Sequence, residues 1–214
     1  MPLLPVNEIF KSIQGEGFFT GSPAVFIRLQ GCDVRCSFCD TKYAMDINPD
    51  YKSMMIGDIA YKKKESPVYC ELRTDALVNF ITKKYPAPVN HHIVLTGGEP
   101  FLHEIDRLIT ELVRFQYFVQ VETSGCHPIE KQDGMWITMS PKQCTIKEHY
   151  QEADELKYIV NQNTDFDKIG DIVHPYIYLQ PESMKVENVK LCVDKTIEYG
   201  FRLSLQTHKL IGMK

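Results

Sequence analysis

The sequence of 214 residues lacks any apolar run long enough to cross a bilayer, since no stretch approaches 18 uninterrupted apolar residues. Its N-terminus also lacks the charged and apolar regions of a secretory signal, so we expect a cytoplasmic protein without membrane contact. Basic charge is scarce: 24 Lys and Arg stand against 28 Asp and Glu, a formal net charge of −4. Nucleic-acid backbones require a basic surface, so no direct nucleic-acid partner is expected.

Glycine and proline are not abundant, at 12 residues each, and 43% of the residues are hydrophobic. This composition excludes a disordered or collagen-like chain. Residues 1–214 are expected to form a single domain. The chain is shorter than the roughly 250 residues of a complete eight-stranded α/β barrel, so any barrel should be smaller. Residues 45–72 are predicted to be an exposed, variable insertion whose charge run, 62–64, is a solvated face.

The seven cysteines are an odd number, and three of them fall within eight residues, which argues against a disulfide scaffold. Cys32, Cys36 and Cys39 follow a predicted strand directly. Three thiolates this close can ligate one metal centre and leave one coordination position open. A structural zinc site would need a fourth ligand, for which the candidates are His91, His92, Cys126 and Cys144. The four cysteines outside the triplet are expected to be buried or incidental thiols.

The hydrophobic periodicity predicts strands alternating with helices, and therefore a mainly parallel sheet. The connection from Val121 to Trp136 is too short for a complete helical crossover, so some helices should be missing or shortened. The predicted strands cover residues 24–30, 92–96, 117–123, 135–139, 156–160, 176–180 and 202–206. The predicted helices run from a cap at Thr74 through Ile81, over about 105–113, and over about 186–199.

The strands also alternate between apolar and polar side chains. In the first, Val25, Ile27 and Leu29 share one face, while Phe26 and Arg28 share the other. We therefore predict an α/β fold: a partial, incomplete TIM-like barrel with reduced helices, whose apolar face meets the helices and whose polar face lines a cavity. The alternative is an ordinary sheet with one solvated face.

Further motifs stand where predicted strands end, which is where parallel sheets and barrels build their sites. In Thr96-Gly97-Gly98-Glu99-Pro100, the glycines permit close approach of a ligand, and the glutamate can accept a hydrogen bond from an ammonium group. By itself this segment would be read as a turn between a strand and a helix. Glu122-Thr123-Ser124-Gly125 and Ser140-Pro141-Lys142 end the next two strands.

The cysteine triplet and the glycine motif resemble those of the radical S-adenosylmethionine (SAM) superfamily. A further set of motifs, spread from residue 10 to residue 209, is similar to the 7-carboxy-7-deazaguanine synthase family of queuosine and 7-deazapurine biosynthesis. These motifs are Phe10-x-x-x-Gln14-Gly15-Glu16-Gly17, the run 26–33, Cys39-Asp40-Thr41-Lys42, Ser140-Pro141-Lys142, Tyr178-Leu179-Gln180-Pro181 and Gln206-Thr207-His208-Lys209.

The resemblance implies a homodimeric radical enzyme, a carbon–nitrogen lyase with a partial barrel. It would convert 6-carboxy-5,6,7,8-tetrahydropterin to 7-carboxy-7-deazaguanine with loss of ammonia, using a [4Fe-4S] cluster, SAM and Mg²⁺. An electron donor such as flavodoxin would reduce the cluster. In relatives, a 5′-deoxyadenosyl radical abstracts the hydrogen at carbon 6 of the pterin, and positioning is much of the protein's contribution.

The resemblance also assigns roles to residues. Cluster ligation falls to Cys32, Cys36 and Cys39, and Mg²⁺ binding to Thr41. Cofactor binding falls to Phe38, Cys39, Asp40, Gly98, Glu99, Glu122, Ser140, Pro141, Lys142 and Gln180. Substrate binding falls to Ile13, Gln14, Gly15, Glu16, Arg28, Thr96 and His208.

The residues can also be judged without the resemblance. On the polar face of a central strand, the planar fork of Arg28 fits a ligand carboxylate, or else a structural ion pair with Glu16 or Glu122. Two other functions share part of the pattern. An enzyme that activates a glycyl-radical protein would need a groove for a protein substrate, and a zinc module would carry out no reaction.

Overall fold

The computed structural model describes residues 3–214, and its strands form one sheet of ten. The sheet order is β10-β9-β8-β7-β6-β5-β2-β1-β4-β3. The strands are β1 (Leu3–Ile13), β2 (Pro23–Leu29), β3 (Lys52–Ser53), β4 (Tyr69–Arg73), β5 (His92–Gly97), β6 (Phe118–Thr123), β7 (Met135–Met139), β8 (Glu155–Val160), β9 (Ile177–Pro181) and β10 (Arg202–Leu203). The helices are α1 (Ile56–Ala60), α2 (Thr74–Lys84), α3 (Asp106–Arg114), α4 (Phe166–Gly170), α5 (Val186–Tyr199) and α6 (Thr207–Leu210).

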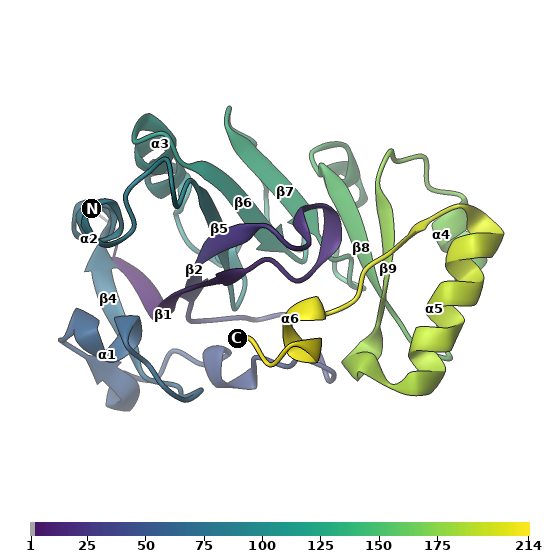
Figure 1. Cartoon of the computed structure of the whole chain (residues 1–214), viewed down its shortest axis with the longest axis horizontal. Coiled ribbons are helices and arrows are strands. Elements are labelled where there is room, and N and C mark those ends of the chain that lie inside the picture. The colour runs from purple at the N-terminus through teal and green to yellow at the C-terminus, as the bar shows by residue number, and fades with distance from the viewer. Residues whose placement is uncertain (1–2) are drawn as a thin grey trace.

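Seven neighbouring strands, from β2 through β5 to β10 in the sheet, run parallel. Strand β1 pairs antiparallel with both β2 and β4 and so extends the sheet beyond the parallel part. The order is linear and ends at β10 and β3, so the barrel is not closed. Figure 1 shows α2 and α3 toward one end of the molecule, α5 at the other, and the C-terminal α6 near the middle. The predicted partial barrel is confirmed.

The two faces of the parallel strands divide as the alternation predicts. Val25, Ile27 and Leu29 of β2 are fully buried in the apolar core, together with Val119 and Val121 of β6. The opposite face carries Phe26 and Arg28 in β2, both partly buried, and buried polar side chains in the following strands, such as Gln120, Thr138 and Glu155. Because these polar groups are buried and bond to one another, the alternative of a sheet with one solvated face is wrong.

The helices are reduced, as predicted. Residues 124–134, which join β6 to β7, contain no helix, and α4 has only five residues. The predicted helix over about 186–199 is α5, and the one over about 105–113 is α3. Thr74 is the first residue of α2 and not its cap, a position that Arg73 occupies. Within residues 3–214, none of the helices is long and apolar enough to cross a membrane.

An aromatic plug fills the end of the barrel where the parallel strands begin. Phe18 and Phe19, in a short 3-10 helix after β1, each pack about 5 Å from the ring of Trp136. Phe19 also contacts the rings of His92 and Phe118, the first residues of β5 and β6. With this end filled, the barrel can admit a ligand at the carboxyl ends of its parallel strands, where such folds build their sites.

Residues 45–72 are only partly the exposed insertion that the sequence predicts. Met54 is exposed, but Ile59 and Cys70 join the apolar core. Lys62 does not belong to a solvated face: its Nζ donates to Asn7 Oδ1 (2.9 Å) and to the carbonyl of Val68 (2.7 Å). Burial lowers the pKa of Lys62 to about 8. The sequence suggests exposure because three consecutive lysines look alike, whereas only this one meets backbone acceptors.

Candidate active site

A cavity of about 610 Å³ opens at the carboxyl ends of the parallel strands, a size typical of small-molecule sites. Every residue assigned to the site in the sequence analysis lines this cavity except Gly15 and Pro141. The assigned residues come from eight separate segments of the chain and meet at one place, as the position of the motifs at strand ends predicts.

The segment after β2 carries Cys32, Cys36 and Cys39, all of which line the cavity. Gln30, which directly follows β2, holds this segment in place: its Nε2 donates to the carbonyls of Tyr43 (3.1 Å) and Asp46 (2.7 Å). Because Gln30 is fully buried, these bonds fix both ends of the loop on the barrel rim.

The chemistry of this donor set fits an iron–sulfur cluster with one open iron, because three soft thiolates face a cavity. Burial raises the pKa of the Cys32 and Cys36 thiols, so binding of the cluster must displace their protons. The candidate fourth ligands for zinc have other partners: Cys126 and Cys144 are joined to each other, His92 contacts Gln120 Oε1 (3.0 Å), and His91 Nδ1 contacts the carbonyl of Pro88 (3.2 Å). In the part of the chain that the structure describes, no group of three or more His, Cys, Asp or Glu converges on a single ion.

The two glycines at the end of β5, Gly97 and Gly98, bring the glycine motif into contact with the cluster loop. Gly97 has a φ of +134°, in the region that side chains avoid. The Gly98 amide donates to the carbonyl of Leu29 (3.0 Å), and the Glu99 amide donates to that of Gly31 (2.9 Å). A Cβ on Gly98 would overlap the Gly31 carbonyl, so only glycine lets these backbones approach.

Gly98→Ala is expected to displace the cluster loop, since backbone and not a flexible side chain occupies the position of the added methyl group. We expect a loss of at least about 1–3 kcal/mol in unfolding free energy, the usual cost of overpacking, and loss of SAM binding to the reconstituted protein. Chemical denaturation and calorimetric titration would measure the two effects. Gly57→Ala is the matched control, because the nearest atom to its added methyl group lies 4.0 Å away; equal behaviour of the two variants would contradict the prediction.

Glu99 lines the cavity, but its carboxylate is already bonded within the protein. Its Oε1 accepts from Thr123 Oγ1 (2.6 Å) and the Phe101 amide (3.2 Å), and its Oε2 accepts from the amide (2.9 Å) and hydroxyl (2.5 Å) of Ser124. A carboxylate has about four acceptor sites. Glu99 therefore ties the end of β5 to that of β6 and has little capacity left for an ammonium group.

The Ser140-Pro141-Lys142 segment after β7 presents its lysine to the cavity. Lys142 Nζ donates to both the carbonyl and the hydroxyl oxygen of Ser140, each at 2.7 Å, and lies 5.7 Å from the centre of the Phe38 ring. Burial lowers the pKa of Lys142 to about 8. On the next strand but one, Gln180 Oε1 accepts from Ser204 Oγ (3.0 Å), which holds the amide at the cavity edge.

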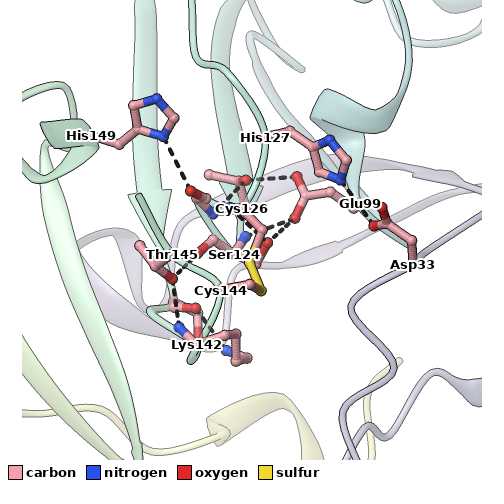
Figure 2. Close-up of a disulfide and its surroundings, with 12 residues drawn as sticks. Asp33, Glu99, Ser124, Cys126, His127, Lys142, Cys144, Thr145 and His149 are labelled. Atoms are coloured by element: carbon pink, nitrogen blue, oxygen red, sulfur yellow. Dashed lines mark hydrogen bonds and ion pairs between the residues drawn. A yellow bond between two sulfur atoms is a disulfide. The ribbon is translucent and has the colours of Figure 1, made fainter. Parts of the chain in front are cut away.

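Cys126 and Cys144 form a disulfide, so the expectation of free thiols is wrong for this pair, while Cys70 and Cys192 are buried thiols as expected. Figure 2 shows the disulfide joining the loops that follow β6 and β7, beside Ser124 and Lys142. The neighbouring His127 contacts Asp33 of the cluster loop (Nε2 to Oδ1, 2.9 Å). The bridge thus restrains the two loops that flank the cofactor residues.

Reduction of this disulfide is expected to lower the unfolding free energy of the protein by about 3 kcal/mol, the loop-closure effect for a bridge across 18 residues. Cys126→Ser should show the reduced value whether or not a dithiol is present. Urea unfolding with and without dithiothreitol measures the difference. Cys192→Ala should keep the full response to the reductant, and a Cys126→Ser protein that still responds would show that the bridge is not its source.

Several polar side chains expected to bind the substrate form one network with Glu122, which the resemblance assigned to the cofactor, and with Gln206. Glu122 on β6 accepts from Gln14 Nε2 (3.0 Å) and from Thr96 Oγ1 (3.1 Å). The Gln14 side chain also accepts from the Glu16 amide (3.1 Å), and Gln206 Nε2 donates to Glu16 Oε1 (2.8 Å). The segment after β1 is therefore held to the barrel interior on one side and to the C-terminal segment on the other.

For Arg28 the sequence leaves open a structural ion pair or the binding of a ligand carboxylate, and the structure has features of both. Its Nε forms an ion pair with Glu8 Oε1 at 2.8 Å, so its partner is neither Glu16 nor Glu122. Among residues 3–214 no hydrogen bond to the two Nη atoms is found, and the side chain lines the cavity. Burial alone would lower the pKa of Arg28, but Tyr43, Glu8 and Glu122 outweigh it and raise the pKa. Arg28 is thus anchored at one nitrogen and open at its outer edge.

The C-terminal segment covers the mouth of the cavity. Lys209 Nζ donates to Asp40 Oδ2 (2.6 Å), and the Thr207 amide donates to the carbonyl of Gly15 (3.0 Å). Burial alone would raise the pKa of Asp40, but the bond from Lys209 outweighs it and holds the pKa below its ordinary value. Gly15 does not line the cavity because His208 packs against it; a Cβ there would overlap that ring. Thr41 lines the cavity, with its hydroxyl 3.5 Å from Cys39 Sγ.

Sequence reasoning missed Lys157 on β8, which lines the cavity with a side chain only 6% exposed. It also missed Glu155 at the start of the same strand, which is fully buried. The available signal was the alternation itself, because Glu155 and Lys157 occupy the polar positions of the run Glu155-Leu156-Lys157-Tyr158. These two residues and Glu122 bring three charged groups into the barrel interior.

Comparison with known proteins agrees with this geometry. Residues 13–128 match a family model described as a 4Fe-4S single cluster domain. The chain is 38% identical to the 7-carboxy-7-deazaguanine synthase of Buchnera aphidicola (98% of this chain, 99% of that one). It is 35% identical to the protein of the same name from Escherichia coli K12, with 98% of each chain covered. The crystal structure of QueE from Escherichia coli superposes with a TM-score of 0.85 at 33% identity, over 95% of this chain and 93% of that one.

These similarities extend over nearly the whole length of each protein and include the cluster loop, so the resemblance inferred from the motifs is confirmed. The chain belongs to the 7-carboxy-7-deazaguanine synthase family and contains its 4Fe-4S cluster domain.

Proposed function

We propose that the protein converts 6-carboxy-5,6,7,8-tetrahydropterin to 7-carboxy-7-deazaguanine with loss of ammonia, as a radical SAM carbon–nitrogen lyase of queuosine and 7-deazapurine biosynthesis. The observation that carries the proposal is the cavity itself. It brings the cysteine triplet, the glycine motif and the open edge of Arg28 together at the carboxyl end of an incomplete barrel. The name of the relatives supports the same reaction.

The cluster and SAM, when bound, supply the carbon radical for hydrogen abstraction. The chain's own residues bind and orient the reactants. Cys32, Cys36 and Cys39 would hold the cluster, and Lys142 and Gln180 would contact SAM at the ends of β7 and β9. The aromatic plug at one end of the barrel and the C-terminal segment at the other would limit the access of water to a reactive radical.

The substrate would lie over β2, β5 and β6. The Nη fork of Arg28 matches the pterin carboxylate, because it can donate two parallel hydrogen bonds. Gln14 and Glu16 offer donors and acceptors for the pyrimidine edge. Thr41 would contribute one oxygen to Mg²⁺, an ion that keeps several waters and takes few protein ligands.

The resemblance also bears on the oligomeric state, the electron donor and the cellular compartment of the enzyme. We propose a homodimer reduced by a flavodoxin-type donor in the cytoplasm, where a cluster with an open iron is protected from oxidants. Residues 1–214 would act as a single domain, and residues 45–72 would vary among relatives because they lie outside the parallel strands, at the β4–β3 edge.

The test is anaerobic reconstitution with iron and sulfide, followed by incubation with SAM, the carboxy-tetrahydropterin, Mg²⁺ and dithionite. We expect a brown protein, formation of 7-carboxy-7-deazaguanine, and loss of turnover when Mg²⁺ is chelated. A colourless protein would favour the zinc module. A cluster that cleaves SAM without forming the deazaguanine would rule out this substrate.

A further inference from the structure

Lys157 on β8 stands inside the barrel between two carboxylates of the substrate network. Its Nζ forms an ion pair with Glu16 Oε2 and lies 3.8 Å from Glu122 Oε1. Glu16 comes from the segment after β1 and Glu122 from the end of β6. The ammonium group of Lys157 therefore joins two acidic groups from separate segments of the chain.

Among residues 3–214, the other cationic side chains near this pair are engaged elsewhere or are held neutral more readily. Arg28 is paired with Glu8, and Lys142 is bonded to the oxygens of Ser140. His208 faces Glu16 and Asp40, but burial lowers its pKa. Burial alone would lower the pKa of Lys157 too, but Glu122 and Glu16 outweigh it and raise the pKa.

A third carboxyl group, that of Glu155, lies in the same interior but has other hydrogen-bond partners. It accepts from Thr138 Oγ1 (2.6 Å) and from the Phe18 amide (2.8 Å), and burial raises its pKa. A carboxyl group that binds a proton more readily needs less counter-charge. The positive charge of Lys157 therefore acts mainly on the carboxylates of Glu16 and Glu122.

We propose that Lys157 is a positioning residue for the pterin: its ammonium group holds Glu16 and Glu122 as a pair of ionised acceptors for the N–H groups of a cyclic guanidine, the pyrimidine end of the substrate. The proposal rests on the function proposed above and assigns a role to a residue outside the recognised motifs. The residues already bonded to the pair, Gln14, Thr96 and Gln206, fix the orientation of the carboxylates but bring no charge.

Removing the ammonium group has a consequence that a purely structural role would not produce. Two carboxylates sharing a buried site repel each other, so one of them would then hold a proton near neutral pH. Protonation turns one carboxyl oxygen into a hydrogen-bond donor and removes the negative charge, so the group accepts fewer and weaker hydrogen bonds from the pterin N–H groups. Pterin affinity should therefore be low at acidic pH and recover as the pH rises above the new pKa, whereas wild-type affinity should change little over that range.

The experiment uses the reconstituted holoenzyme without a reductant, so that the carboxy-tetrahydropterin binds but does not react. For Lys157→Met, calorimetric titration at a series of pH values should give a Kd raised about 10- to 100-fold at the acidic end, the effect of losing hydrogen bonds to a charged group. The loss should shrink as the pH rises. Lys157→Arg restores a cation and should recover most of the affinity. Lys84→Met, which removes a half-buried lysine from the outer helix α2, is the control and should bind as the wild type does.

Infrared spectroscopy of the ligand-free proteins provides a second measurement. Lys157→Met should gain a protonated-carboxyl band, beyond any from Glu155, that disappears in the double variant with Glu16→Gln or Glu122→Gln. If the Met variant does not fold, Lys157→Gln replaces it in both measurements with the same expected direction. Wild-type affinity at every pH and no additional band would overturn the role of Lys157 alone. A wild-type holoenzyme that binds no pterin would instead overturn the proposed function and, with it, the substrate part of this inference.

Discussion

Replacing Cys36 with serine is expected to remove the iron–sulfur cluster and with it all detectable cleavage of SAM. A cluster held by three thiolates has no spare protein ligand, and a serine hydroxyl is a poor substitute for a soft thiolate. The remaining cysteines cannot compensate: Cys70 and Cys192 are buried, and the other two are joined to each other. Iron content, visible absorbance and release of 5′-deoxyadenosine measure the loss, which should be equally complete for Cys32→Ser and Cys39→Ser.

The matched control is Cys192→Ala, a change at a fully buried thiol of α5 that faces the apolar core and not the cavity. It should keep the cluster and the cofactor cleavage of the wild-type protein, with at most a modest loss of stability. If Cys36→Ser retained its full iron content, or if Cys192→Ala lost it, the ligand set proposed here would be wrong.

Much of the barrel could be predicted because side chains that face the apolar core alternate along its strands with side chains that face the interior. In β2 and β6, fully buried valine and leucine alternate with side chains that line the interior, and the sequence shows this period directly. The long strand β1 was not predicted. Its residues Asn7 and Glu8 are fully buried yet polar, so the strand has no apolar period to recognise. Their partners, Gln30 and Arg28, become visible only once β1 and β2 are paired.

Contacts between loops could not be predicted for a similar reason. Cys126 and Cys144 approach because parallel neighbours end at the same edge of the sheet, so the loops after β6 and β7 start side by side. The sequence shows that each loop follows a strand, but it does not show that these two strands are neighbours. Motifs identified the site residues individually, whereas the pairs Glu16–Lys157 and Asp40–Lys209 form only when segments far apart in the sequence fold together.

Arg28→Ala is expected to leave the cluster in place and to weaken binding of the carboxy-tetrahydropterin about 10- to 100-fold. A hydrogen bond to a charged group is worth about 1.5–3 kcal/mol, and about 1.4 kcal/mol corresponds to a factor of ten in Kd. The fold should survive, because Glu8 keeps an ion pair with Lys214 and a hydrogen bond from Tyr43 (3.1 Å) after the arginine is removed. Titration of the reconstituted, unreduced protein with the pterin measures the effect.

Two further variants separate the open edge of the guanidinium from its anchored nitrogen. Arg28→Lys keeps the charge but loses the planar fork, so its affinity should lie between those of the wild type and Arg28→Ala. Glu8→Gln removes the charge of the anchor and leaves the fork, and since Arg28 stays charged under all ordinary conditions, pterin affinity should fall by much less than in Arg28→Ala. The Nη atoms have no protein hydrogen bond among the described residues. Loss of these atoms should therefore affect mainly their bonds to the ligand carboxylate. Unchanged pterin affinity in Arg28→Ala would show that Arg28 serves only the ion pair with Glu8.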